Sequence, residues 1–201
     1  MKIYPANLDH KSSHQLQAST VVPRPIAFVS TISEDGTFNL APFSTFAGIS
    51  VEPPIVCFSV VWRRDGQKKD TLKNIEFSRD FVINVVNETL AQAMNQTSAS
   101  YPSSVDEFKE VGLTPVKSDI VKAPRVAESP VNMECKLRQI LEFGKSPGGS
   151  NLIIGEVVLV HLGDELVIDG QIQMSRLKAI GRLGGDSYCR TTETFEMKRP
   201  D

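Results

Sequence analysis

The chain has 201 residues, 40% of them hydrophobic, which is enough for one sizeable core, so we expect a single domain spanning 1–201 with 1–22 as an N-terminal extension. Its 22 Lys and Arg residues nearly balance 24 Asp and Glu residues, and a net charge of -2 argues against nucleic acid as a partner. Because no apolar run approaches about 18 residues and the N-terminus lacks the apolar block of a secretion signal, we expect no membrane partner and a cytoplasmic location.

The cysteines and histidines indicate neither a disulfide framework nor a metal site. Cys57, Cys135 and Cys189 are odd in number and far apart in the sequence. His10 and His14 can share one face of a helix, but no third ligand is nearby. We therefore interpret both histidines as part of a solvated N-terminal segment.

The first predicted element is a β-hairpin. The prolines of Pro23-Arg24-Pro25 fix φ and exclude a helix there. The β-rich stretch 26–32 then predicts a strand, Glu34-Asp35-Gly36-Thr37 predicts a tight turn, and the returning strand runs over 38–40. Pro42 follows this strand. Because proline donates no ladder hydrogen bond, we expect position 42 at a sheet edge or bulge, where backbone groups stay free.

The next strand is predicted at 55–62, where an almost wholly apolar run indicates a strand covered on both faces. Ser59 is the one polar residue of this run. It either bonds to neighbouring backbone or contacts a ligand, and the sequence leaves both open.

A charged loop, 63–66, leads to a short helix that begins near two lysines. Asp70 or Thr71 is the expected N-cap, and Leu72 and Ile75 form its apolar stripe. The N-terminus of a helix favours negative charge, so this segment is a candidate phosphate site.

The remaining chain combines a helical excursion with three further strands. A strand is predicted at 81–86, followed by a helix capped by Asn87. Ser104-Val105-Asp106-Glu107 matches a capping box, and Gly112 fits the end of that helix. Two long strands, 131–143 and 152–162, complete the pattern, and the first alternates apolar and polar residues with period 2. Six or seven strands in short steps favour an antiparallel barrel.

The motifs of nucleophilic, zinc and dinucleotide-binding enzymes are missing from the sequence. There is no GxSxG, no HExxH and no GxGxxG following a strand. This pattern is compatible with redox chemistry carried out by a bound flavin, which needs no acidic, basic or nucleophilic side chain.

Several ordered blocks of the chain resemble the flavin reductase-like family of FMN-binding split-barrel proteins. They include PRPIAFVST at 23–31, NLAPFS at 39–44, KDTLKNI at 69–75 and GEV at 155–157. The RLGG block at 182–185, with Tyr188 after it, extends the match over nearly the whole chain. Arg24 and Tyr188 lie in matching blocks without an assigned role.

The resemblance implies a mainly β fold with α excursions, a homodimeric six-stranded antiparallel split β-barrel with Greek-key connections that binds FMN near the subunit interface. It places the isoalloxazine ring along one backbone segment and the ribityl and phosphate end of FMN near a second strand. The phosphate itself would bind at the helix N-terminus, with the Asp70 amide rather than its carboxylate as a ligand. The implied cofactor-binding residues, in that order, are Leu40, Ala41, Pro42, Phe43 and Ser44, then Ser59 and Val60, then Arg63, Lys69, Asp70 and Thr71.

The function implied by the resemblance is an FMN-dependent oxidoreductase of the flavin reductase type. NADH or NADPH would pass a hydride to flavin N5, and no side chain is assigned a catalytic role. Two alternatives stay open: an FMN-binding electron-transfer protein or oxygenase partner that does not turn over NAD(P)H, and a structural barrel without a cofactor.

Overall fold

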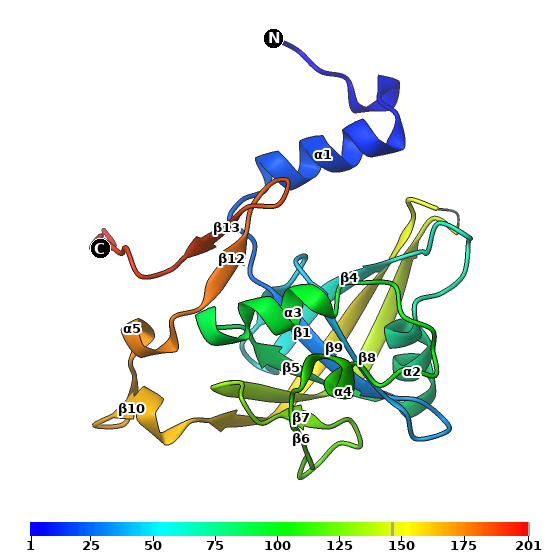
Figure 1. The fold of residues 1–201 in the computed structure, drawn as a ribbon. Helices are drawn as coiled ribbons and strands as arrows, with labels where there is room; N and C mark the ends of the chain where they lie inside the picture. Colours follow the sequence, from blue (N-terminus) through cyan, green and yellow to red (C-terminus); the bar gives the residue numbers. More distant parts are fainter. Residues whose placement is uncertain (146, 201) are drawn as a thin grey trace.

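The computed structural model of the protein describes residues 1–145 and 147–200. Figure 1 shows a strongly curved sheet with short helices packed around it and one helix, α1, standing off from the rest. The sheet is antiparallel, with the strand order β2-β1-β5-β8-β9-β4-β3. Its strands are β1 (Ala27–Ile32), β2 (Phe38–Phe43), β3 (Ala47–Ser50), β4 (Ile55–Val61), β5 (Asp80–Val85), β8 (Val131–Phe143) and β9 (Ser150–Leu162).

Short elements complete the fold. Three small hairpins pair β6 (Pro115–Val116) with β7 (Arg125–Val126), β10 (Val167–Ile168) with β11 (Gln171–Ile172), and β12 (Ile180–Arg182) with β13 (Tyr188–Arg190). The helices are α1 (His10–Thr20), α2 (Asp70–Ser78), α3 (Ala91–Gln96), α4 (Glu107–Val111) and α5 (Met174–Leu177), with 3₁₀ turns at Pro5–Asn7, Glu88–Leu90 and Asp164–Leu166. None of the described helices combines the length and apolar character needed to cross a membrane.

The curvature of the sheet brings one edge strand back toward the other side. Strand β2 is an edge, yet the ring of Phe43 on β2 lies 5.2 Å, centroid to centroid, from the ring of Phe58 on β4. The expected mainly β, antiparallel split-barrel class is therefore confirmed. The strand count differs, because the main sheet has seven strands rather than six. The additional strand, β3, is short and fully exposed, and its sequence Ala-Gly-Ile-Ser has no apolar alternation that would predict it.

Two apolar cores lie on opposite faces of the first hairpin. The barrel interior contains Val29, Phe43, Phe58 and Phe81, and α2 closes it with Leu72 and Ile75 as expected, among other residues. The second core packs Phe28 and Leu40 against α3 and α4. Strand β1 is thus buried on both faces, and this fixes the hairpin, including its edge strand β2, firmly in place.

The predicted helix starts are confirmed in part. Asn87 accepts a hydrogen bond from the Leu90 amide, and Gly112 ends α4 with a φ of 68°. The capping box is wrong, because Asp106 caps α4 and Glu107 turns toward β2. The predicted cap of α2 is also wrong. Lys69 occupies the N-cap without a capping side-chain bond, since Asp70 and Thr71 already lie inside the helix.

Candidate functional site

A cavity of about 120 Å³ lies where β2, the loop before α2, and the loop after α3 meet. Six of the eleven predicted cofactor-binding residues line it. They are Ala41, Pro42, Arg63, Lys69, Asp70 and Thr71. Residues 30 positions apart in the sequence are therefore brought to one place, as the resemblance requires.

The β2 side of the cavity is an open strand edge. Pro42 lies opposite Phe28 in the ladder between β2 and β1, and no strand of the described chain pairs with the other side of β2. The expectation that position 42 lies at an edge is confirmed, although the strand runs on through Phe43 rather than ending before the proline. The missing amide hydrogen of proline is tolerated there. The Leu40 amide is already bonded to Glu107, so a ligand can meet only the remaining outer backbone groups of β2.

The α2 side of the cavity supplies positive charge. The Lys69 ammonium is half-buried and lies 5.8 Å from the centroid of the Phe43 ring. Burial lowers the pKa of Lys69, and the nearby Arg63 guanidinium lowers this pKa further. Within residues 1–145 and 147–200, no carboxylate forms an ion pair with Lys69. This unneutralised cation favours an anion in the cavity.

The side chain of Asp70 is a counter-ion to neighbouring cations rather than a ligand. Its carboxylate pairs with Arg63 on one oxygen and with Lys73, at 3.1 Å, on the other. Arg63 is therefore partly neutralised, and Lys69 is the stronger candidate for a phosphate contact. The Asp70 amide stays available, because it belongs to the first turn of a helix without a side-chain cap.

The Thr71 hydroxyl belongs to a buried hydrogen-bond network that forms the floor of the cavity. It donates to Asn39 Oδ1 at 2.8 Å, and Asn39 Nδ2 donates to Glu107 Oε1 at 2.7 Å. The other oxygen of Glu107 accepts the Leu40 amide at 3.1 Å. Burial raises the pKa of Glu107, and the bonds from Leu40 and Asn39 oppose that rise. Since the Thr71 hydroxyl proton is already used, its backbone amide is the better donor to a ligand.

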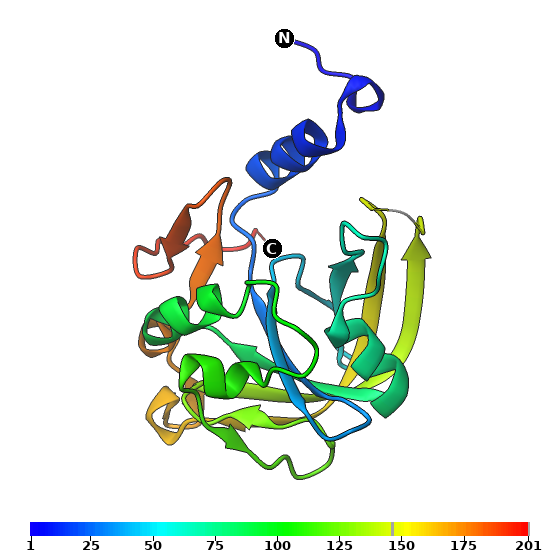
Figure 2. The ribbon, with the colours of Figure 1, turned by 45° about the vertical axis from the view of Figure 1, so that its right-hand side comes forward.

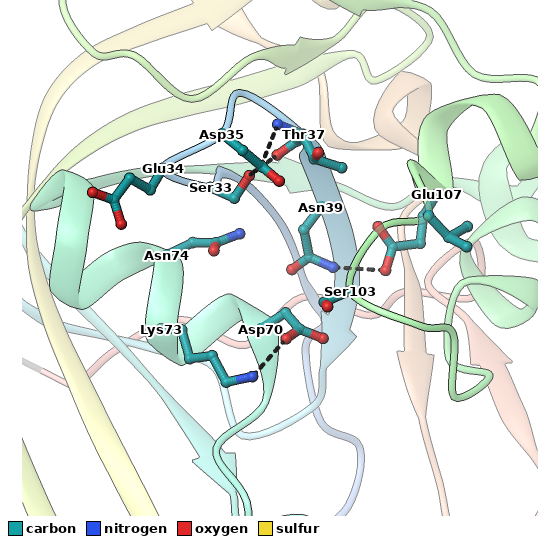
Figure 3. A pocket seen from close by; sticks show the side chains of 11 residues that line it. Ser33, Glu34, Asp35, Thr37, Asn39, Asp70, Lys73, Asn74, Ser103 and Glu107 are labelled. Atoms are coloured by element: carbon teal, nitrogen blue, oxygen red, sulfur yellow. Dashed lines mark hydrogen bonds and ion pairs between the residues drawn. The ribbon is translucent and has the colours of Figure 1, made fainter.

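A second cavity, of about 470 Å³, lies on the other side of this network (Figure 3). Figure 3 shows Asn39 on β2 facing Glu107 across a hydrogen bond, with Asp70 of α2 below Asn39, and these three residues line both cavities. Glu34 and Asp35 add further negative charge to the larger cavity, and Lys73 is the one cation among the described residues that line it. The two neighbouring cavities therefore differ in charge, and the smaller one suits an anion better.

The other five predicted residues lie outside the smaller cavity. Leu40 and Val60 are fully buried in the two cores, and Phe43 is 6% exposed in the barrel core. Ser59 is half-buried, and its amide donates to Thr45 Oγ1 at 2.8 Å. Ser44 is half-buried and accepts a hydrogen bond from Arg24 Nε at 3.3 Å. These residues can meet a ligand only beyond the cavity mouth or through their backbone.

The loop after α3 is the part of the cavity wall that the sequence did not predict. Thr97 and Ser98 each donate their hydroxyl hydrogen to a carbonyl of α3, so their hydroxyl oxygens can act toward a ligand only as acceptors. The signal was the run Thr-Ser-Ala-Ser-Tyr at 97–101, directly after a helix. Small hydroxyl residues at such a position are typical of loops that approach a polar ligand closely.

The donor set of the smaller cavity fits the phosphate of FMN. A half-buried ammonium, a second cation and the free amides of a nine-residue helix face one small space beside an open strand edge. Such groups bind phosphate with charge-assisted hydrogen bonds.

Comparison with known proteins shows the family of the chain. The family described as flavin reductase like domain matches residues 19–174. The Bacillus subtilis protein YwrF is 39% identical over 206 residues, covering 100% of both chains. Nitrilotriacetate monooxygenase component B from Bacillus cereus superposes with a TM-score of 0.93 at 34% identity over 98% of each chain. The 2-nitrobenzoate 2-nitroreductase NbaA from Pseudomonas fluorescens gives a TM-score of 0.90 at 31% identity, covering 100% of this chain and 96% of its own. The chain described here therefore belongs to the flavin reductase like domain family.

Proposed function

We propose that this protein is an FMN-binding oxidoreductase that accepts a hydride from NADH or NADPH. The observation that carries the proposal is the Lys69 ammonium, half-buried without a carboxylate partner in the described part of the chain, at an uncapped helix start beside the open edge of β2. FMN, when bound, supplies a ring atom, N5, that takes up the hydride, so the protein needs no acid, base or nucleophile of its own.

The residues of this chain bind and orient the cofactor in the proposed function. Lys69 and the amides of Asp70 and Thr71 hold the phosphate, and Arg63 adds a partly neutralised positive charge. The backbone of 40–44 borders the ring, with its register fixed because Leu40 and Phe43 are anchored in the two cores. Anchoring on both sides of Ala41 and Pro42 pre-organises this edge before the ligand arrives.

A second candidate function is a flavin-binding partner of an oxygenase that exchanges electrons without turning over NAD(P)H. The likeness to nitrilotriacetate monooxygenase component B at 34% identity favours the partnership with an oxygenase. The likeness to a nitroreductase at 31% identity favours an enzyme that passes electrons onward itself. The two candidates share the FMN site and differ in the electron donor.

Anaerobic stopped-flow mixing of the FMN-loaded protein with NADH, and separately with NADPH, distinguishes them. We expect the absorbance of oxidised flavin to bleach with at least one donor and to recover on admitting oxygen. Bleaching by dithionite but by neither nucleotide would reject the reductase and leave the electron-transfer partner. Failure of the purified protein to bind FMN at all would reject both.

We further propose that the protein is a cytoplasmic homodimer. All four residues of edge strand β3 are exposed, and Ile49 within it is 54% exposed. An open, partly apolar edge strand is prone to pairing, and a second copy of the chain would cover it. Sedimentation equilibrium should give twice the mass of the chain, and Ile49→Lys should shift the equilibrium toward monomer; a monomeric wild type would contradict this.

A further inference from the structure

Arg24 connects three segments that are far apart in the sequence. Its guanidinium donates from Nη1 to the carbonyls of Ala18 at 2.6 Å and Val21 at 2.8 Å, at the end of α1. Nη2 donates to the Leu183 carbonyl at 3.0 Å, in the hairpin of β12 and β13. Nε donates to Ser44 Oγ at 3.3 Å, directly after β2. One side chain thus ties both terminal segments to the end of the proposed ring-binding segment.

The segment that Arg24 holds is otherwise attached only lightly. In Figures 1 and 2, α1 stands off from the barrel with its C-terminal end beside the hairpin of β12 and β13. No residue of α1 is buried. A side-chain carbon at Gly184 would lie 2.7 Å from Ser19 Oγ, so the hairpin tip approaches the helix as closely as glycine allows. Arg24 is therefore the main polar anchor at this junction.

The charge of Arg24 has no counter-ion among residues 1–145 and 147–200. Each of its side-chain hydrogen bonds goes to a neutral oxygen, and the charged group that acts on it is another cation, Arg182. Burial lowers the pKa of Arg24, and Arg182 lowers it further. A half-buried guanidinium without a carboxylate costs free energy, so its place beside Ser44 calls for an explanation other than stability.

The hydrogen bond from Arg24 also determines the hydrogen-bonding role of the Ser44 hydroxyl. A serine hydroxyl has one proton to donate and an oxygen that accepts. Here the oxygen accepts from Arg24, and no acceptor within the described part of the chain takes the Ser44 proton. The hydroxyl is therefore a free donor, and it is strengthened because its oxygen is bonded to a cation.

We propose that Arg24 is a positioning residue that orients and polarises Ser44 as a hydrogen-bond donor to the flavin ring, so that the site favours reduced FMN. This inference rests on the proposed FMN function. Reduction adds negative charge to the ring, and a fixed, polarised donor stabilises that charge more than it stabilises the oxidised ring. Arg24 acts through Ser44 and need not touch the cofactor itself.

The test compares FMN reduction potentials of wild type, Arg24→Gln, Ser44→Ala and the double variant, together with their affinities for oxidised FMN. Each single variant should lower the preference for reduced over oxidised FMN about tenfold, which is about 30 mV for a two-electron couple. The double variant should lower it no further, because both changes remove the same donor. Arg24→Lys should recover part of the loss, since it keeps the charge.

Arg182→Gln is the matched control. It removes the positive charge that acts on Arg24, but Arg182 stacks 4.4 Å above the Tyr188 ring and donates to the Gly185 carbonyl rather than to Ser44. We expect its potential to equal that of wild type. An equal drop in Arg182→Gln, or additive drops in the double variant, would overturn the role of Ser44.

Ser44→Ala keeps the test decisive if Arg24→Gln fails to fold, because it leaves every contact of α1 intact. An unchanged potential in Ser44→Ala with FMN bound would overturn the proposal. Absence of FMN binding by wild type would instead refute the proposed function.

Discussion

Lys69 differs from its neighbour Lys68 in what surrounds its ammonium group. Lys68 Nζ pairs with both oxygens of Glu76, at 2.6 and 2.8 Å, on the outer side of α2. Lys69 has no such partner in the described chain; it lines the smaller cavity, and its Nζ lies 5.8 Å from the centroid of the Phe43 ring in the barrel core. Two adjacent residues of one type thus have separate roles, and the chain offers its own control.

The variant Lys69→Ala should weaken FMN binding by roughly 1.5–3 kcal/mol, through loss of a charge-assisted contact. Fluorescence titration with FMN measures the change. Lys68→Ala should leave the affinity within about 0.5 kcal/mol of wild type, because the Lys68 ammonium is paired with Glu76 and Lys68 does not line the smaller cavity. Equal effects of the two variants would show that the phosphate does not bind at Lys69.

The lowered pKa of Lys69 predicts how FMN affinity depends on pH. Binding uses the protonated ammonium, so affinity should fall as the pH rises through the pKa of the free protein. Since burial and Arg63 lower this pKa, the fall should begin below the value of about 10.4 that is usual for lysine. The same titration repeated between pH 7 and 10 measures it. Lys69→Ala should show a flat profile over the range in which wild type loses affinity.

Among the elements, strand β8 is predicted correctly by the local sequence pattern, but the burial of its polar face is not. Its bounds, Val131–Phe143, agree with the period-2 alternation of the sequence. Glu134 lies on the polar face of this pattern, yet it is completely buried. Its carboxylate accepts the amides of Asp119, Ile120 and Val121, together with a bond of 2.7 Å involving His161 Nε2. The covering loop is distant in sequence, so no local pattern could reveal it.

The same reason explains the other differences between sequence and structure. Strands and turns follow from nearby residues, as in the hairpin of β1 and β2. The capping box failed because Glu107 finds better partners in Asn39 and Leu40, almost 70 positions away. Within the site, the residues of the two motifs converge, but the loop 97–101 belongs to neither and could be placed only by the fold. Long-range partners override local preference wherever a polar group is buried.

Replacing the buried carboxylate should loosen the loop that covers β8. Glu134→Gln leaves at least one buried amide without an acceptor, which costs roughly 1–3 kcal/mol. Urea unfolding at pH 7 measures it. Glu156→Gln is the control, since Glu156 pairs with a largely exposed Arg138 and its loss should cost less than about 1 kcal/mol.

Stability at low pH should depend on the same carboxylate. Burial alone would raise the pKa of Glu134, but the amide and His161 bonds outweigh burial and lower it. A group whose pKa is lower in the folded state than in the unfolded state stabilises the fold above the unfolded pKa. Its contribution is lost as the pH falls from about 4.5 through the folded pKa. In acid unfolding, Glu134→Gln should therefore lose less stability over this range than wild type does; equal losses would assign the acid sensitivity to other groups.

At the scale of the whole molecule, FMN would contact three separate parts of the fold. The smaller cavity is bordered by β2, by α2 and by the loop after α3, and each packs on a different portion of the two cores. A ligand that contacts all three stabilises only the state in which they are assembled. Its effect must therefore appear in the global unfolding transition as well as locally.

FMN at about 100 times its dissociation constant should raise the free energy of unfolding by about 2.7 kcal/mol. For a chain of this size, that corresponds to a rise in Tm of roughly 5–11 °C.

Differential scanning calorimetry with FMN, and with riboflavin at the same concentration, measures the contribution of the phosphate. Riboflavin should give a clearly smaller shift in wild type, because it leaves the Lys69 ammonium and the helix amides without an anion. In Lys69→Ala the two flavins should give nearly equal shifts. A wild-type protein that responds equally to both would place the phosphate outside the cavity, whereas one that responds to neither would have no flavin site in this fold.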